Sequence, residues 1–220
     1  LFHAEESQTV HILLDMSRSM GAGKPPKIIS AQKIAAAISY ICLANLDKIN
    51  MMAFSDRILD ISPLVRGKRK YSKILSYLLS LTPDNLTNIN ACLSEYASIC
   101  KHPGIAIVLS DLFDPKGYQD GLKALTYRNF DVNLIQVLDH EEIYWSKTGT
   151  FLLRDVETGE KKRTSVDTAL LQRYHQRVDT FLSEIRDFCS NYGIHYYVHD
   201  TSIMFEEFLI NYLTKGAIFR

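Results

Sequence analysis

The sequence has no excess of charge of either sign, since 25 Lys and Arg residues stand against 25 Asp and Glu residues in a chain of 220. It also has no signal-peptide pattern at its start and no apolar run close to the roughly 20 residues that a membrane-spanning helix needs. A protein that holds nucleic acid or a membrane surface by bulk attraction needs a strong positive excess. We therefore expect no nucleic-acid partner and no membrane contact from this segment.

Cysteine is scarce, and its spacing argues against the common structural zinc sites. The four cysteines lie far apart in segments that read as helices, and none forms a Cys-x-x-Cys pair: Cys42, Cys92, Cys100 and Cys189. The seven histidines do not cluster with them at zinc-ligand spacing. Four buried free thiols are typical of a reducing compartment, which predicts a cytoplasmic protein.

Two enzyme signatures are missing as well. No Gly-x-Ser-x-Gly elbow of a serine hydrolase occurs. Residues 21–24 (GAGK) have too short a glycine spacing for a phosphate loop, and Pro25 stands where that loop needs Ser or Thr. Serine-hydrolase chemistry and nucleotide binding are therefore not expected.

The basic clusters at 66–70 and 161–163 contain no interleaved aromatic residues, so we interpret them as solvated charges.

What the sequence does have is an alternation of short apolar runs and long amphipathic ones. The apolar runs predict strands at 9–14, 50–54, 105–109, 131–138 and 194–198, with 58–64 running back beside the second. Helical spacing predicts helices at 27–46, 71–80, 89–101, 118–127, 171–192 and 204–213. This alternation predicts an α/β fold, a Rossmann-like doubly wound, mainly parallel sheet with helices on both faces. No boundary interrupts it, so we expect one domain over residues 1–220.

One stretch breaks the alternation. Residues 150–166 contain Glu157-Thr158-Gly159-Glu160, which is typical of a turn between two strands. We predict an inserted β-hairpin there, extending the edge of the sheet. The chain begins at Leu1 rather than Met, so we expect it to be a piece of a longer chain.

Carboxylates stand at the ends of three predicted strands. Asp15, Asp111 and Asp139 each follow an apolar run. In an open parallel sheet, ligands bind beyond the carboxyl ends of the strands. We expect Asp15 and Asp111 to face a solvent-open pocket at that edge, and Asp139 to lie close to it.

Hydroxyl groups accompany these carboxylates. Ser17 and Ser19 follow Asp15 by two and four residues, so both can point into one pocket on a tight turn, and Thr87 opens a predicted helix. Oxygen ligands of this kind suit Mg²⁺ or Mn²⁺. Neutral hydroxyls leave such an ion underneutralised, so that it can accept a carboxylate from a partner.

Three segments resemble the metal-ion-dependent adhesion site of von Willebrand factor A domains: residues 15–19 (DMSRS), Thr87 within 86–93 (LTNINACL), and Asp111 within 108–114 (VLSDLFD). One departure is that Asn85-Leu86 precedes the threonine, where the pattern often has two glycines. The backbone of that loop is therefore less free to take a positive φ. The resemblance implies direct metal contacts from Ser17, Ser19 and Thr87, with Asp15 and Asp111 bound through water or switching to direct contact.

The wider sequence resembles the bacterial family called domain of unknown function 58. The segments that carry this resemblance are 11–20 (HILLDMSRSM), 52–56 (MAFSD), 108–114, 134–142 (LIQVLDHEE) and 154–160 (RDVETGE). The resemblance implies a von Willebrand A-type fold in a longer chain. It also implies a non-enzymatic, metal-dependent protein-interaction module that acts with a MoxR-type AAA+ ATPase in complex assembly or chaperone-like roles.

The alternative is a magnesium-dependent phosphatase of the haloacid dehalogenase type, which also places an Asp after its first strand. That chemistry needs a second Asp two residues later to protonate the leaving group. Ser17 occupies that position and cannot do so. The interaction module is therefore preferred, with no catalytic residues proposed.

Overall fold

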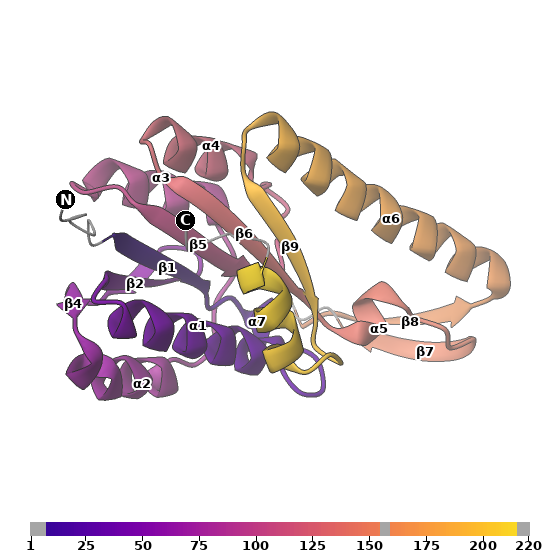
Figure 1. The fold of residues 1–220 in the computed structure, drawn as a ribbon. Helices are drawn as coiled ribbons and strands as arrows, with labels where there is room; N and C mark the ends of the chain where they lie inside the picture. Colours follow the sequence, from indigo (N-terminus) through magenta and orange to yellow (C-terminus); the bar gives the residue numbers. More distant parts are fainter. Residues whose placement is uncertain (1–7, 155–158, 215–220) are drawn as a thin grey trace.

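The fold, seen in a computed structural model that describes residues 8–154 and 159–214, is built on a seven-stranded sheet (Figure 1). Its strand order is β3-β2-β1-β5-β6-β9, and β4 also pairs with β2. These strands are β1 (Thr9–Asp15), β2 (Lys48–Phe54), β3 (Ile58–Ile61), β4 (Val65–Arg66), β5 (Ile105–Ser110), β6 (Asp131–Leu138) and β9 (His195–Asp200). The helices are α1 (Lys27–Ala44), α2 (Tyr71–Ser80), α3 (Ile89–Ile99), α4 (Gln119–Tyr127), α5 (His140–Ile143), α6 (Thr168–Asn191) and α7 (Phe205–Thr214).

The sheet is mainly parallel. β1 pairs in parallel with β2 and β5, and the parallel pairing continues to β6 and β9. Only β3 and β4 run antiparallel to their neighbour β2. The central strands β1 and β5 are buried along most or all of their length, which explains their unbroken apolar runs. The predicted doubly wound α/β fold is confirmed.

Helices cover both faces of this sheet (Figure 1). One buried cluster joins α1, α2 and α7 to one face, and a second joins α3, α4 and α6 to the other. Within the described residues, α1 is long and apolar enough to cross a membrane by length and composition. The prediction from the sequence was that no such apolar run occurs. More than half of α1 is buried inside the protein. Its apolar residues, such as Ile34 and Ile38, belong to the core.

Several predicted element ends shift by a few residues, and local backbone geometry explains why. The helix predicted to end at residue 46 ends at Ala44, and Leu46 takes a φ of 63°, which a right-handed helix cannot include. The helix predicted over 89–101 ends at Ile99, because Cys100 is extended. All four cysteines are free, as predicted, but Cys100 is only half-buried.

The hairpin exists, but its predicted place at the sheet edge is wrong. β7 (Gly149–Arg154) and β8 (Lys161–Val166) pair with each other as a separate two-stranded sheet within the described residues. The predicted turn falls partly on residues 157 and 158, which lie outside the described residues. The single turn of α5 leads the chain away from β6 before the hairpin begins, and Trp145 packs edge-on against Phe151 of β7. The hairpin lies beside α6 instead (Figure 1).

Gly104 allows β1 and β5 to approach each other, which gives a first test of the fold. A Cβ at this position would overlap the carbonyl oxygen of Thr9. We expect Gly104→Ala to lower the free energy of unfolding by about 1–3 kcal/mol, because the backbone of two paired strands must shift. Urea denaturation measures this. The matched control is Gly21→Ala, whose Cβ would meet Pro83 at an ordinary 3.4 Å. An equal effect of the two substitutions would contradict the account.

Candidate functional site

Two carboxylates meet at one edge of the sheet. Asp15 is the last residue of β1, and Asp111 directly follows β5. Because β1 and β5 pair in parallel, their carboxyl ends lie side by side. Both residues are fully buried. The sequence predicted that Asp15 and Asp111 face a solvent-open pocket, and their burial shows that this prediction is wrong.

The carboxyl group of Asp15 is held on both oxygens. The backbone N–H of Ser17 donates to Oδ1 at 2.8 Å, and the Ser110 hydroxyl donates to Oδ2 at 2.6 Å. Burial and, to a smaller extent, the nearby charge of Asp111 raise the pKa of Asp15 to about 7, although the hydrogen bonds from Ser110 and Ser17 partly oppose the rise. Two buried carboxyl groups side by side favour a cation between them, because it relieves the repulsion between their charges.

Two hydroxyls lie beside Asp15. A 3₁₀ turn, η1 (Arg18–Gly21), follows β1, so that Ser17 and Ser19 are both buried with their Oγ atoms 3.0 Å apart. In an octahedral magnesium site, neighbouring oxygens lie about 2.9 Å apart. Within the described ranges, no group of three or more His, Cys, Asp or Glu side chains could hold a metal ion. An ion at this edge would therefore need hydroxyl ligands, and the residues present fit that need.

The loop that carries Thr87 is tied to the same turn. The backbone N–H of Arg18 donates to the carbonyl of Asn85 at 3.0 Å, and Thr87 is buried, with 5% of its surface exposed. Asn85 takes a φ of 68°. Asparagine is among the residues that tolerate this conformation best. The absence of glycine before Thr87 therefore does not prevent a left-handed backbone in this loop.

A buried lysine, which sequence reasoning missed, contacts Asp111. The Nζ of Lys27 lies 2.8 Å from Asp111 Oδ2 and 2.5 Å from Glu142 Oε1, and its side chain has no exposed surface. The other oxygen of Asp111 accepts from the backbone N–H of Phe113 at 2.9 Å. The Phe113 ring lies 4.8 Å from Nζ. An ammonium group is thus enclosed by two carboxylates and an aromatic face.

One sequence signal could have drawn attention to Lys27. It is the first residue of α1, which has no acidic residue in its first turn and no side-chain cap on its first N–H groups. The positive end of a helix dipole favours Asp or Glu over Lys at this point. A lysine there, against the dipole, is enough to single the residue out, although the pattern does not show whether its side chain is buried.

Asp139, which directly follows β6, has another role than lining the carboxylate pair. Asp139 caps the single turn of α5, accepting from the N–H of Glu141 at 2.9 Å, and also accepts from the N–H of Lys24 at 3.3 Å. His140 pairs with Asp200 at 2.8 Å. Asp139 therefore lies at the expected edge of the sheet, where it orders the loop before α1.

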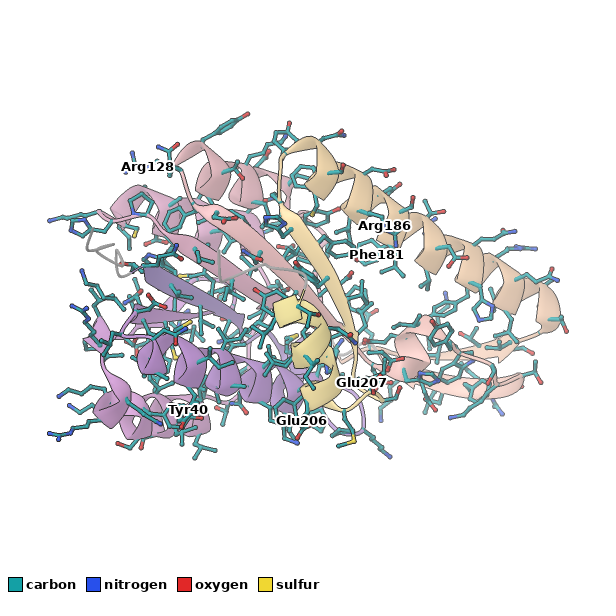
Figure 2. All side chains as sticks on the ribbon, viewed as in Figure 1. Tyr40, Arg128, Phe181, Arg186, Glu206 and Glu207 are labelled. Carbon is teal, nitrogen blue, oxygen red and sulfur yellow. The ribbon has the colours of Figure 1, made fainter. Side chains whose placement is uncertain are left out.

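Glu142 is the member of this acidic segment that reaches the site. Its Oε2 accepts from the backbone N–H of Asp139 at 2.8 Å, completing a capping box, while Oε1 contacts Lys27. Glu142 also lines a groove of about 740 Å³. Phe181 of α6, labelled in Figure 2, lines this groove. Its ring stacks on that of Phe113, with 5.8 Å between ring centroids.

Comparison with protein families assigns the chain. The model of the family described as "Protein of unknown function DUF58" matches residues 1–181. The chain belongs to the DUF58 family. Uncharacterized proteins of Mycobacterium tuberculosis and Mycobacterium bovis are 23% identical to it over 173 residues, covering 76% of this chain and 54% of theirs. This DUF58 chain therefore spans about half the length of the curated relatives it matches.

Solved structures support the fold. An aerotolerance-related membrane protein from Bacteroides fragilis matches with a TM-score of 0.55 at 18% identity, over 95% of this chain and all of that one. BatB from Bacteroides thetaiotaomicron matches with 0.55 at 15% identity, over 96% and 100%. The pilus adhesin SpaC from Lactobacillus rhamnosus GG matches with 0.58 at 10% identity, over 98% of this chain and 31% of its own. These identities support a shared α/β fold alone.

Proposed function

We propose that this DUF58 chain is a divalent-metal-dependent protein-interaction module rather than an enzyme. The residues that would hold Mg²⁺ or Mn²⁺ are those at the carboxyl edge of the sheet: Asp15, Ser17, Ser19, Thr87 and Asp111. The observation that carries the proposal is the buried pair of serine hydroxyls, 3.0 Å apart, beside two buried carboxylates. When bound, the ion supplies a positive charge that an acidic side chain of a partner protein can meet.

The chain's own residues prepare this site. Ser110 and the N–H of Ser17 orient the Asp15 carboxylate, and the N–H of Phe113 orients Asp111. Leu112, between the strand end and Phe113, takes a φ of 62°. A bulky residue in that conformation is strained, and such strain is kept where it aims a functional group. The backbone after β5 is thus bent so that Asp111 faces the sheet edge.

The metal-binding step has a direct test. We expect calorimetry to show one Mn²⁺ bound per chain, and Ser17→Ala/Ser19→Ala to weaken that binding by at least about tenfold, because two neutral oxygen ligands are removed without a change of charge. Ser76→Ala/Ser80→Ala, which replaces two exposed helical serines, is the matched control. Mn²⁺ binding that is equal in both double variants would contradict the proposed ligand set.

The partner and the absence of turnover need separate experiments. The family resemblance points to a MoxR-type AAA+ ATPase as the partner. A pull-down of that ATPase by this chain should depend on divalent metal and be lost in EDTA. Turnover of a generic phosphate ester with magnesium would support the phosphatase alternative instead. The proposed module predicts none, because Ser17 stands where that chemistry needs an acid.

A further inference from the structure

The buried charge of Lys27 is not accounted for by the proposed metal site. An ammonium group is tolerated inside a protein only where negative groups neutralise it. The Lys27 side chain has no exposed surface, and the negative groups that its Nζ contacts are the carboxylates of Asp111 and Glu142. Lys27 therefore forms a buried ion pair with Asp111, one of the carboxylates that would bind the metal ion.

The three side chains form a row of alternating charge. The carboxylate of Asp111 contacts the ammonium of Lys27 at 2.8 Å, and this contacts the carboxylate of Glu142 at 2.5 Å. The proposed function requires the same order of charges, namely Asp111, a metal cation and the acidic side chain of a partner. Both ends of the row are present within the chain itself.

Glu142 stands at the point where a partner would enter. Its side chain is 26% exposed, whereas those of Lys27 and Asp111 have no exposed surface. It also lines the groove between α6 and the end of the sheet. A carboxylate arriving from solvent through this groove would therefore meet Glu142 before it met any other member of the row.

We propose that Lys27 and Glu142 are an internal occupant of the site, in which the ammonium stands in for the divalent ion beside Asp111 and the Glu142 carboxylate stands in for the partner's acidic side chain. This inference rests on the proposed function and adds its regulation. A divalent ion binds only when Lys27 leaves Asp111, and a partner binds only when its carboxylate displaces Glu142. The row keeps the site closed and neutralises part of its negative charge when no ion is present.

The test removes both internal charges at once. Lys27→Met/Glu142→Gln replaces the ion pair with neutral side chains of similar size and leaves the net charge unchanged. We expect calorimetry to show Mn²⁺ binding at least about tenfold tighter than in the wild type, because the competing cation is gone. Thermal unfolding gives a second readout. Saturating Mn²⁺ should raise the melting temperature of the variant by about 3–5 °C more than it raises that of the wild type.

Matched variants keep the result interpretable. Lys24→Met/Glu141→Gln makes the same charge change at two exposed neighbours and should leave the Mn²⁺ affinity of the wild type unaltered. If the methionine variant does not fold, Lys27→Gln/Glu142→Gln retains amide donors toward Asp111 while removing both charges. The same increase in affinity is expected of it.

The outcomes separate the two proposals. Tighter Mn²⁺ binding in the Lys27/Glu142 variant alone supports the internal occupant, whether the wild type binds weakly or not at all. Equal or weaker binding in that variant, with binding retained in the wild type, overturns the internal occupant and leaves the metal-dependent module standing. Absence of binding in every protein overturns both.

Discussion

Lys27→Met alone is expected to lower the free energy of unfolding by about 3–5 kcal/mol, measured by urea denaturation in EDTA. The substitution leaves the carboxylates of Asp111 and Glu142 without the ammonium that lies 2.8 Å and 2.5 Å from them. Breaking a buried ion pair by removing one partner is costly because the remaining charge stays away from water. Here two carboxylates are left, and the carboxyl group of Asp15 lies near that of Asp111.

The control for this effect is Lys24→Met, three residues earlier in the chain. Lys24 is exposed, and its backbone N–H donates to Asp139. Exposed substitutions of this kind change stability by about 0.5 kcal/mol or less. A similarly small effect of Lys27→Met would show that the carboxylates are neutralised by protonation or by water instead, and would contradict the ion-pair account.

The second large effect is on the stability of the protein at low pH. His199, on β9, is buried against Phe208, with 4.8 Å between ring centroids, and neither ring nitrogen has a hydrogen-bond partner among the described residues. Burial lowers its pKa from 6.5 to about 4, and the charge of Asp200 only partly opposes this. We expect His199→Leu to gain about 3 kcal/mol of stability relative to the wild type between pH 7.5 and pH 4.

The sign follows from proton binding. The unfolded chain protonates His199 below about pH 6.5, and the folded chain does so only near pH 4, so the wild type loses stability as the pH falls through that window. His11, whose pKa burial also lowers to about 4, adds the same trend in both proteins. Asp15 acts oppositely, because its raised pKa contributes stability at low pH that is lost as the pH rises through about 7. The contributions of His11 and Asp15 are the same in the variant and the wild type, so they cancel in the difference between the two free energies of unfolding.

Denaturant unfolding of the two proteins in EDTA, at several pH values from 7.5 down to 4, measures this difference. His195→Gln is the matched control, because His195 lies on the same strand but is exposed. The free energy of unfolding of this control should differ from that of the wild type by no more than about 0.5 kcal/mol at every pH. A pH-independent difference for His199→Leu would mean that His199 is charged in the folded protein, contrary to its apolar surroundings.

Much of the fold followed from patterns that are local in the chain. The run at 131–138 and the helical spacing at 71–80 predicted β6 and α2 at their observed bounds. The hairpin could be recognised from the sequence as two short strands, but its position in the fold could not be predicted. Strand pattern says nothing about which partner a hairpin finds, and packing against Trp145 and α6 decided that.

Some features of the candidate site also followed from local sequence patterns, and others depended on the tertiary structure. The sequence alone determined that Asp15, Ser17 and Ser19 share one turn after β1, since their spacing and the strand-end rule are local properties. Only the tertiary structure decided that this edge is closed. The closure depends on the contact between Lys27 and Glu142, 115 residues apart in the chain, and on the contact between Lys27 and Asp111. A lysine at the start of a helix has the same local pattern whether it is solvated or buried, because the carboxylates that decide its environment are supplied by packing.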